Sequence, residues 1–134
     1  MAIENVNPSS MKLKDMVNLI YEMNIKNLGF NLDTGHAGLY GDDPAKAAEL
    51  MGEKLWHTHL QDNFGANDDH CPPGIGILDW RKILKALIKI KYKGVFMLEL
   101  TGTGVKSHRT IEQLKTFPLE KEMVFGINYL KFLL

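Results

Sequence analysis

The sequence predicts an α/β fold in which short parallel strands alternate with helices. Short apolar runs recur along the chain, and between them apolar residues return at the spacing of an amphipathic helix. Successive runs lie roughly one strand-plus-helix unit apart, which is the repeat of a βα barrel. Each run also ends on a residue type that binds metal ions well. We therefore expect a single domain over residues 1–134, built on a parallel sheet.

The first half of the chain predicts two strands and two helices. The first strand covers residues 2–6, and the turn at 7–10 leads into a helix. Apolar residues at helical spacing give that helix one face, made of Leu13, Met16, Val17, Ile20 and Met23. A second strand covers 29–32 and is apolar almost throughout, as buried parallel strands are. Asp43 and Pro44 are a typical helix start, and that helix should stop near Gly52.

The second half continues the alternation. A third strand is expected over 55–61, then a loop over 63–78 rich in Gly, Asn, Asp and Pro. Asp79 should cap the next helix, whose apolar face would be Trp80, Ile83, Leu84, Leu87 and Ile88. A fourth strand covers 95–100, and residues 101–116 predict one more short strand or a turn. Pro118 opens a final helix with an apolar side of Leu119, Met123, Ile127, Leu130 and Leu134.

Composition restricts the partners that the chain is expected to bind. Sixteen basic and sixteen acidic residues cancel, so no global charge attracts nucleic acid, which is not an expected partner. The only cysteine, Cys71, excludes an internal disulfide and fits a reducing compartment. No apolar stretch reaches the roughly 20 residues that cross a bilayer, and the first residues do not resemble a signal peptide. A cytoplasmic protein without a membrane partner is the expectation.

The strand ends carry the residues of greatest chemical interest. The first two runs close on Glu4 and Asp33, and the next two on His59 and Glu99. The carboxyl ends of the strands meet on one face of a βα barrel, so these side chains should meet there. A carboxylate that follows a buried strand is costly to desolvate unless it is paired or coordinated. Asp33 or Glu99 alone fits a buried salt bridge or a helix cap equally well, but four such residues together favour a cation site.

Three histidines lie near these strand ends. His36 follows Asp33 across Gly35, which lets the chain turn sharply, so the imidazole should face the same cavity from a loop. The alternative is a turn with a surface histidine. His57 and His59 share one face of the third strand because side chains alternate along a strand. His59 is the expected ligand and His57 lies deeper or supports it; the alternative is a pair of hydrogen-bonded core histidines.

The acidic loop after the third strand offers Asp68 and His70. Both are expected to contact substrate or to hold a second metal ion, although a solvated acidic turn fits the composition equally well. Cys71 is expected to be an incidental thiol because no base that would activate it is identifiable. Gly74-Ile75-Gly76 is not a dinucleotide fingerprint, since it follows a loop and lacks the third glycine.

In its motifs the chain resembles the C-terminal half of the xylose isomerase-like TIM barrel superfamily. That superfamily contains sugar (phosphate) isomerases and epimerases and the zinc-dependent AP endonucleases of family 2. The resemblance runs from about residue 2 to residue 100 and is carried by Ile3-Glu4-Asn5, Asp33 to Ala37, His57 to Asn63, Asp68 to His70, Pro73 to Gly76, Leu78-Asp79-Trp80, Tyr92-Lys93-Gly94 and Leu98-Glu99. Each motif is weak singly, but their order and spacing are specific for the superfamily and much less so for the substrate.

The resemblance implies a divalent metal ion, Mn²⁺, Mg²⁺, Co²⁺ or Zn²⁺, bound by Glu4, Asp33, His59 and Glu99. A site rich in carboxylate oxygens with one imidazole suits these ions. Glu4 and Glu99 would also be the acid and base of a ketose epimerase or an aldose–ketose isomerase. The implied reaction is proton transfer through a metal-bound enediolate of a sugar or sugar phosphate. His36, Asp68 and His70 would bind the substrate.

The resemblance also leaves alternative activities. Tagatose-type 3-epimerases carry an arginine six residues beyond the ligand histidine, where this chain has Gly65, so the broader isomerase or epimerase class is expected. The other branch is an AP endonuclease-like zinc phosphodiesterase, in which His36, Asp68 and His70 match ligands of an additional zinc. That branch uses two further histidines from earlier strands, which this chain does not contain.

Chain length raises the question of completeness. A full barrel needs about 250 residues, and this chain of 134 matches only the later strands. Four or five parallel strands would leave two open edges and a half-exposed inner face. We therefore expect either a homo-oligomer or pairing with a missing N-terminal half-barrel. The alternative of another class is a non-catalytic half-barrel fragment or subunit that retains the ligands.

Overall fold

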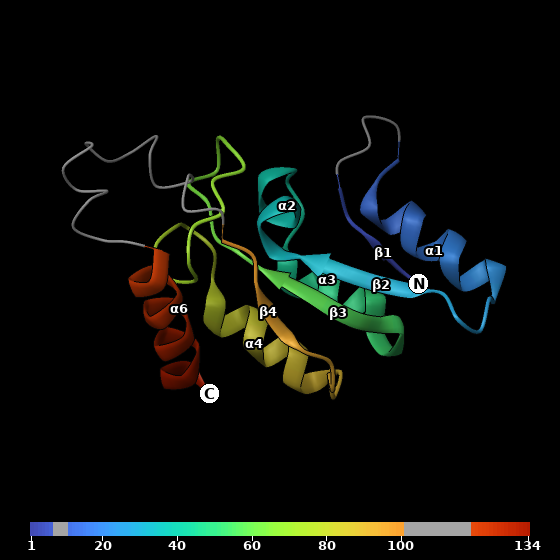
Figure 1. Cartoon of the computed structure of the whole chain (residues 1–134). Coiled ribbons are helices and arrows are strands. Elements are labelled where there is room, and N and C mark those ends of the chain that lie inside the picture. Colours follow the sequence, from blue (N-terminus) through green and yellow to red (C-terminus); the bar gives the residue numbers. More distant parts are fainter. Residues whose placement is uncertain (7–10, 101–118) are drawn as a thin grey trace.

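The computed structural model describes residues 1–6, 11–100 and 119–134, whose strands form a single parallel sheet (Figure 1). The strands are β1 (Ala2–Glu4), β2 (Gly29–Asp33), β3 (Leu55–Leu60) and β4 (Phe96–Leu98), and they lie side by side in chain order. Each neighbouring pair is parallel. The predicted α/β architecture of parallel βα repeats is confirmed.

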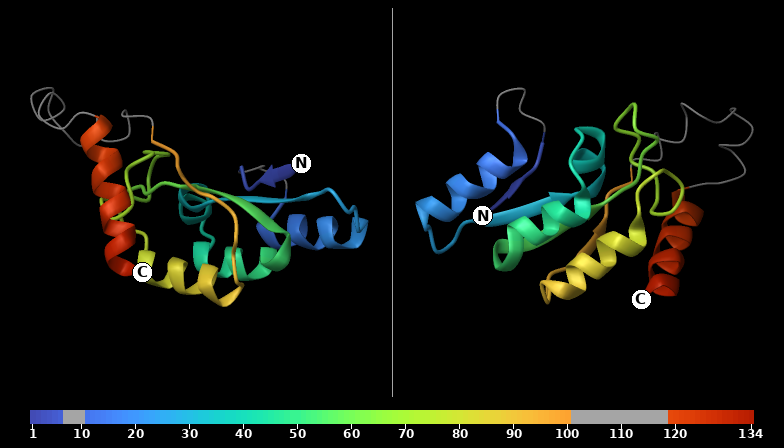
Figure 2. Two further views of the ribbon diagram at one scale, coloured as in Figure 1. Left: turned by 60° about the horizontal axis from the view of Figure 1, so that its bottom comes forward. Right: turned by 180° about the vertical axis from the view of Figure 1, so that it is seen from behind.

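Three helices, α1 (Leu13–Met23), α3 (Pro44–Met51) and α4 (Trp80–Lys89), pack on one face of the sheet, and none of the three lies on the opposite face (Figure 2). The predicted caps are present. The Asp43 carboxylate accepts a hydrogen bond from the Ala45 N–H, and the Asp79 carboxylate accepts one from the Lys82 N–H. A short 3₁₀ turn, η1 (Gly52–Lys54), connects α3 to β3. These caps fix where each helix begins and so where the preceding loop must end.

The hydrophobic core lies between the sheet and these helices. β2 is its centre, because all five of its residues are buried. Phe30 and Leu32 of β2 are fully buried and pack with Ala48 and Met51 of α3 and Ile83 of α4 in the same cluster. β2 therefore holds Asp33, the residue at its end, in a rigid and dry position.

The structure corrects several predicted boundaries. β1 ends at Glu4 and β4 covers only Phe96–Leu98, so both edge strands are shorter than predicted. A six-residue helix, α2 (Thr34–Leu39), stands where a loop was predicted. The prediction was wrong because Thr34-Gly35-His36 has no helical apolar period, whereas tertiary packing buries the segment and Asp33 caps it. The predicted strand or turn at 101–116 and the start at Pro118 lie outside the described residues.

The final helix, α6 (Leu119–Leu133), buries a face that shares only Leu130 with the predicted one. It buries Glu122, Gly126 and Leu130, while Leu119, Met123, Ile127 and Leu134 are exposed. Gly126 explains why this face is the buried one, because a β-carbon there would stand only 3.0 Å from the Pro73 ring. On α4, Ile88 is exposed as well, although the rest of its predicted apolar face is buried. None of the helices in the described parts of the chain has the length and hydropathy to cross a bilayer.

Candidate metal centre

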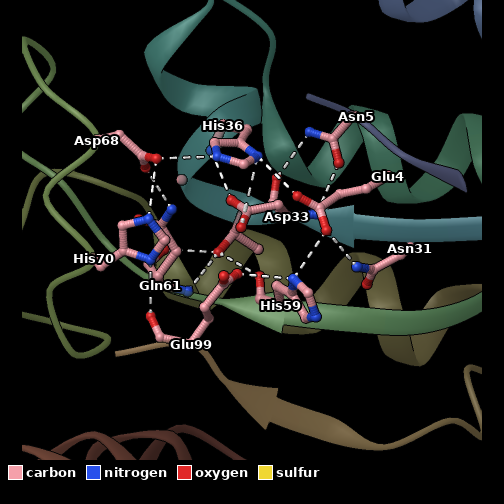
Figure 3. A network of polar contacts seen from close by, with 12 residues as sticks. Glu4, Asn5, Asn31, Asp33, His36, His59, Gln61, Asp68, His70 and Glu99 are labelled. Carbon is pink, nitrogen blue, oxygen red and sulfur yellow. Dashed lines mark hydrogen bonds and ion pairs between the residues drawn. The ribbon is translucent and has the colours of Figure 1, made fainter. Parts of the chain in front are cut away.

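Four side chains predicted as ligands meet beyond the carboxyl ends of the strands (Figure 3). Register explains the meeting, because Asp33 of β2 lies directly beside His59 of β3. Glu4, at the end of β1, and Glu99, immediately after β4, reach the same place from the two outer strands. The centre therefore draws one residue from the end of each strand.

His59 lies between the two glutamates. Its Nδ1 is 3.0 Å from Glu4 Oε2 and 2.8 Å from Glu99 Oε2. The Asn31 amide also donates a hydrogen bond to Glu4 Oε2, at 2.8 Å. Two carboxylates thus face one imidazole nitrogen, and Asn31 fixes the orientation of one of them.

Asp33 uses its two oxygens differently. Oδ1 accepts the His36 N–H at 2.7 Å and caps α2, so the helix-cap alternative is correct for this oxygen. Asn5 holds the backbone of Asp33 with one hydrogen bond to its N–H and one to its carbonyl, at 2.7 and 2.9 Å. Oδ2 is buried and turned toward the centre. Burial, together with the nearby Glu99 carboxylate, raises the pKa of Asp33 to about 7 although the His36 N–H and the His36 ring oppose the shift.

The centre has the donor set of a divalent cation site. Asp33 Oδ2, His59 Nδ1 and Glu99 Oε2 are buried, and none makes a hydrogen bond of good geometry with the described residues. Ligand atoms of Glu4, Asp33 and His59 all lie within 4.8 Å of one another. Buried polar atoms without hydrogen bonds are costly. A cation held by three carboxylates and one imidazole would satisfy them, so these residues fit a divalent metal.

A second group, of His36, Asp68 and His70, lies beside the first. Asp68 Oδ2 is 3.2 Å from His36 Nε2 and 3.0 Å from His70 Nε2. His36 is buried, so the surface-histidine alternative is wrong; its Nδ1 is 3.2 Å from Glu4 Oε1 and its ring therefore connects the two groups. Burial alone would lower the pKa of His36, but the surrounding carboxylates of Asp33, Asp68 and Glu4 raise it.

Gln61, Asp62 and Asn63 form a supporting layer, and none of the three was predicted as a site residue. The Gln61 amide donates to Asp68 Oδ1 at 2.8 Å, and Asn63 donates to the Gly35 carbonyl at 2.8 Å. All three side chains are fully buried directly after β3. The sequence carried a signal for these residues. A polar side chain that follows a buried strand is costly to desolvate unless it is paired, and this holds after β3 as it does for Asp33 and Glu99.

His57 supports the centre indirectly, through Asn31. Its Nδ1 is 3.3 Å from Asn31 Oδ1, and Asn31 in turn holds Glu4. The His57 ring also meets the His59 ring edge to face, with centroids 5.5 Å apart. The supporting position predicted for His57 agrees with these contacts, and Cys71, in the neighbouring loop, is buried.

The chain is similar to known proteins along most of its length. The family model described as Xylose isomerase-like TIM barrel matches residues 1–131. An uncharacterized protein of Methanocaldococcus jannaschii is 33% identical over 113 residues, which are 81% of this chain and 38% of that protein. Fructoselysine 3-epimerase of Escherichia coli O157:H7 is 38% identical over 52 residues, 39% of this chain and 19% of the enzyme. A solved structure of a D-tagatose 3-epimerase-like protein matches with a TM-score of 0.63 and 26% identity, covering 90% of this chain and 48% of that one.

These matches identify the architecture of the sheet. The chain spans less than half the length of each of the three proteins. Its strands and helices follow one another as consecutive βα units of a barrel, with the candidate centre at the carboxyl end where barrels carry their active sites. The chain therefore belongs to the xylose isomerase-like TIM barrel family.

Proposed function

We propose that this chain is the metal-binding and proton-transferring part of a sugar isomerase or epimerase. The observation that carries the proposal is the position of Glu4 and Glu99. Their carboxylates reach the same His59 nitrogen from the two outer strands of the sheet. Two carboxylates that face one cation from different sides are suited to remove a proton from one face of a substrate carbon and return it to the other.

The remaining residues have distinct roles in this proposal. Glu4, Asp33, His59 and Glu99 would hold the divalent cation, which when bound supplies positive charge for the oxygens beside the reacting carbon. Asn31 orients Glu4 through the hydrogen bond to its Oε2. His36 and His70 present ring nitrogens around Asp68 and would bind substrate hydroxyl or carbonyl oxygens. Relatives named as a fructoselysine 3-epimerase and a D-tagatose 3-epimerase-like protein support a ketose as substrate.

Metal content is the first test. Purified wild-type protein dialysed against Mn²⁺ should retain about one equivalent, while Asp33→Asn and Glu99→Gln should each retain less than a tenth of that. Glu49→Gln is the matched control, since Glu49 pairs with Lys89 on the surface of α3 and α4. Wild-type metal content in both site variants would remove the proposed centre.

Proton exchange is the test of the reaction. Ketoses incubated with the Mn²⁺-loaded chain in D₂O should gain deuterium at the carbon next to the carbonyl, as followed by proton NMR. Glu4→Gln and Glu99→Gln should slow the exchange about a hundredfold or more, because each removes one general acid–base group and also one proposed ligand of the cation. Exchange as fast in both variants as in the wild-type protein would contradict the proposed roles.

A second candidate activity rests on the neighbouring histidine group. Ligand atoms of His36, Asp68 and His70 lie within 4.8 Å of one another, which also fits a metal ion. Such a group favours an AP endonuclease-like zinc phosphodiesterase. The zero net charge opposes a DNA-binding groove. Cleavage of an abasic-site oligonucleotide by the Zn²⁺-loaded protein, lost in His70→Ala, would support this activity over the isomerase.

A further inference from the structure

Three polar side chains form a row across the sheet that ends in the candidate centre. The strand register places Glu4 of β1 beside Asn31 of β2, and Asn31 beside His57 of β3. The Asn31 amide donates to Glu4 Oε2 at 2.8 Å (Figure 3), and Asn31 Oδ1 is 3.3 Å from His57 Nδ1. Asn31 is buried, so water does not compete strongly for these contacts. The polar row of His57, Asn31 and Glu4 therefore connects His57 to a proposed metal ligand.

The carboxylate at one end of the polar row fixes the direction of both contacts. An ionised carboxylate only accepts hydrogen bonds, so the Asn31 amide must turn its NH₂ group toward Glu4. The amide oxygen of Asn31 then faces His57, and because this oxygen only accepts, His57 Nδ1 must carry the proton. Donation thus runs from His57 to Asn31 and from Asn31 to Glu4.

An irregularity in the pairing of β2 with β3 brings His57 into the polar row. The register shifts by one residue just before Asn31, so that His57 and not Trp56 lies beside it. Gly29 makes room for Trp56, since a β-carbon at residue 29 would stand 2.5 Å from the Trp56 ring. Such bulges often redirect a side chain next to an active site. Here the bulge replaces an indole with a hydrogen-bond donor of the right position.

The two oxygens of Glu4 face different partners. Oε2 accepts from Asn31 and is 3.0 Å from His59 Nδ1. Oε1 is 3.2 Å from His36 Nδ1, on the side of the histidine group that would bind substrate. Rotation about the last side-chain bond of Glu4 would exchange the two oxygens, and the hydrogen bond from Asn31 opposes that rotation.

We propose that His57 is a positioning residue, which acts through Asn31 to hold Glu4 with Oε2 toward the cation and Oε1 toward the substrate. This inference rests on the proposed function and adds which oxygen of Glu4 handles the proton. The proton that leaves the substrate carbon forms an O–H bond at Oε1, while the electron pair of the broken C–H bond stays on the substrate. Oε2 stays with Asn31 and the cation throughout.

Nuclear magnetic resonance of the metal-free chain tests the direction of the polar row. In a long-range proton–nitrogen spectrum of the wild-type protein at pH 8, the His57 ring should carry a proton on Nδ1. In Asn31→Leu this preference should be lost, because the acceptor for that proton is gone. A wild-type His57 ring protonated on Nε2 alone would overturn the proposal, since Nδ1 could not then donate.

Mn²⁺ affinity tests whether His57 acts through Asn31. His57→Phe keeps a ring against His59 but removes the donor, and should weaken Mn²⁺ binding about tenfold, as Asn31→Leu should. The double variant should also lose about tenfold rather than about a hundredfold, because both residues act through one contact with Glu4. His57→Asn places an amide N–H near the position of Nδ1 and should bind within about threefold of wild type. Circular dichroism checks that all variants are folded.

Additive losses in the double variant, or a His57→Asn that binds Mn²⁺ as weakly as His57→Phe, would overturn the proposal. With saturating Mn²⁺, His57→Phe should lower kcat for deuterium exchange about tenfold and leave KM unchanged. A raised KM with unchanged kcat would overturn the assignment of Oε1 to the proton. Mn²⁺ binding without any exchange in the wild type would refute the proposed reaction instead, while the NMR and affinity results still decide the role of His57.

Discussion

Asp33 shows why the centre forms at the end of β2. One oxygen caps α2 and the other faces the candidate metal, so a single side chain ties the helix to the site. The sequence predicted its position from a carboxylate that follows a buried strand. It left the helix cap and the cation as alternatives because sequence alone does not separate the two oxygens of a carboxylate.

Asp33→Asn should stabilise the metal-free protein at alkaline pH. The pKa of Asp33 in the folded protein, about 7, exceeds the ordinary aspartate pKa of 3.8, so the contribution of Asp33 to the free energy of unfolding falls as pH rises through this window. Above this window the buried Asp33 carboxylate is ionised, and its desolvation lowers the free energy of unfolding by the full amount. Asparagine at this position carries no charge and removes that cost. In EDTA at pH 8 urea unfolding should show a gain of about 2 kcal/mol, shrinking toward pH 4. A variant less stable than wild type at pH 8 would contradict the sign.

The contacts of Asp68 and His70 were predictable only in part. Their residue types and the loop were recognised, but solvation was an equal alternative. The structure places Asp68 between two imidazoles and the Gln61 amide. Burial by itself raises the pKa of Asp68, yet the Gln61 hydrogen bond and the two imidazoles lower it below its usual value. This outcome depends on His36 of α2, 32 residues away in sequence, and on Gln61, seven residues away at the end of β3.

At the level of elements, Asp62 fixes the loop that joins β3 to α4. Its carboxylate accepts the N–H groups of Asn63, Gly74 and Leu78 and the Trp80 indole N–H, at 2.7 to 3.1 Å. Loop 63–78 could be recognised as a loop from its composition. Its path could not, because one buried carboxylate with partners up to 18 residues away sets it.

Asp62→Ala should destabilise the protein by about 3 kcal/mol, because it leaves several buried donors without an acceptor. Asp62→Asn keeps the oxygen toward Asn63 and Leu78 and should lose about half of that. Urea unfolding followed by Trp fluorescence measures both changes. Asp69, the second acid after Asp62 along the chain, also accepts a backbone N–H and is therefore no neutral control. Asp42→Asn, on the surface, is the control and should change stability by less than about 0.5 kcal/mol. Equal stability of Asp62→Ala and wild type would contradict the assigned role.

Gly35→Ala should separate α2 from the end of β3. A β-carbon at residue 35 would stand 2.0 Å from the Gln61 amide oxygen, so the Gln61 side chain must move and release Asp68. We expect a loss of stability of about 2 kcal/mol and weaker substrate binding with the metal content kept. Differential scanning calorimetry measures the loss of stability, and metal analysis checks that the metal content is kept. An unchanged melting temperature would contradict the steric argument.

Caps and apolar periods predicted most elements. α3 and α4 begin as predicted because Asp43 and Asp79 carry their own capping signal. α2 escaped prediction because its stability comes from burial among β2, β3 and the loop. The face of α6 was wrong because the close approach of Pro73 to Gly126, and not the density of apolar residues, decides which side packs.

At the scale of the whole molecule, the four strands and their order were predictable from the βα repeat, and the family match covers residues 1–131. The sequence left pairing with a second copy and pairing with a missing N-terminal half-barrel as equal alternatives, and the chain spans less than half the length of the relatives that it matches.

Mn²⁺ binding measured by isothermal titration calorimetry decides whether the strand-end residues form one cation site. Wild-type protein should bind about one Mn²⁺ per chain at neutral pH, and His59→Ala, Asp33→Asn and Glu99→Gln should each weaken binding at least about tenfold. Glu49→Gln should bind as wild type does. Binding of wild-type strength in the three site variants, or no binding in the wild type, would mean that these residues do not form a cation site.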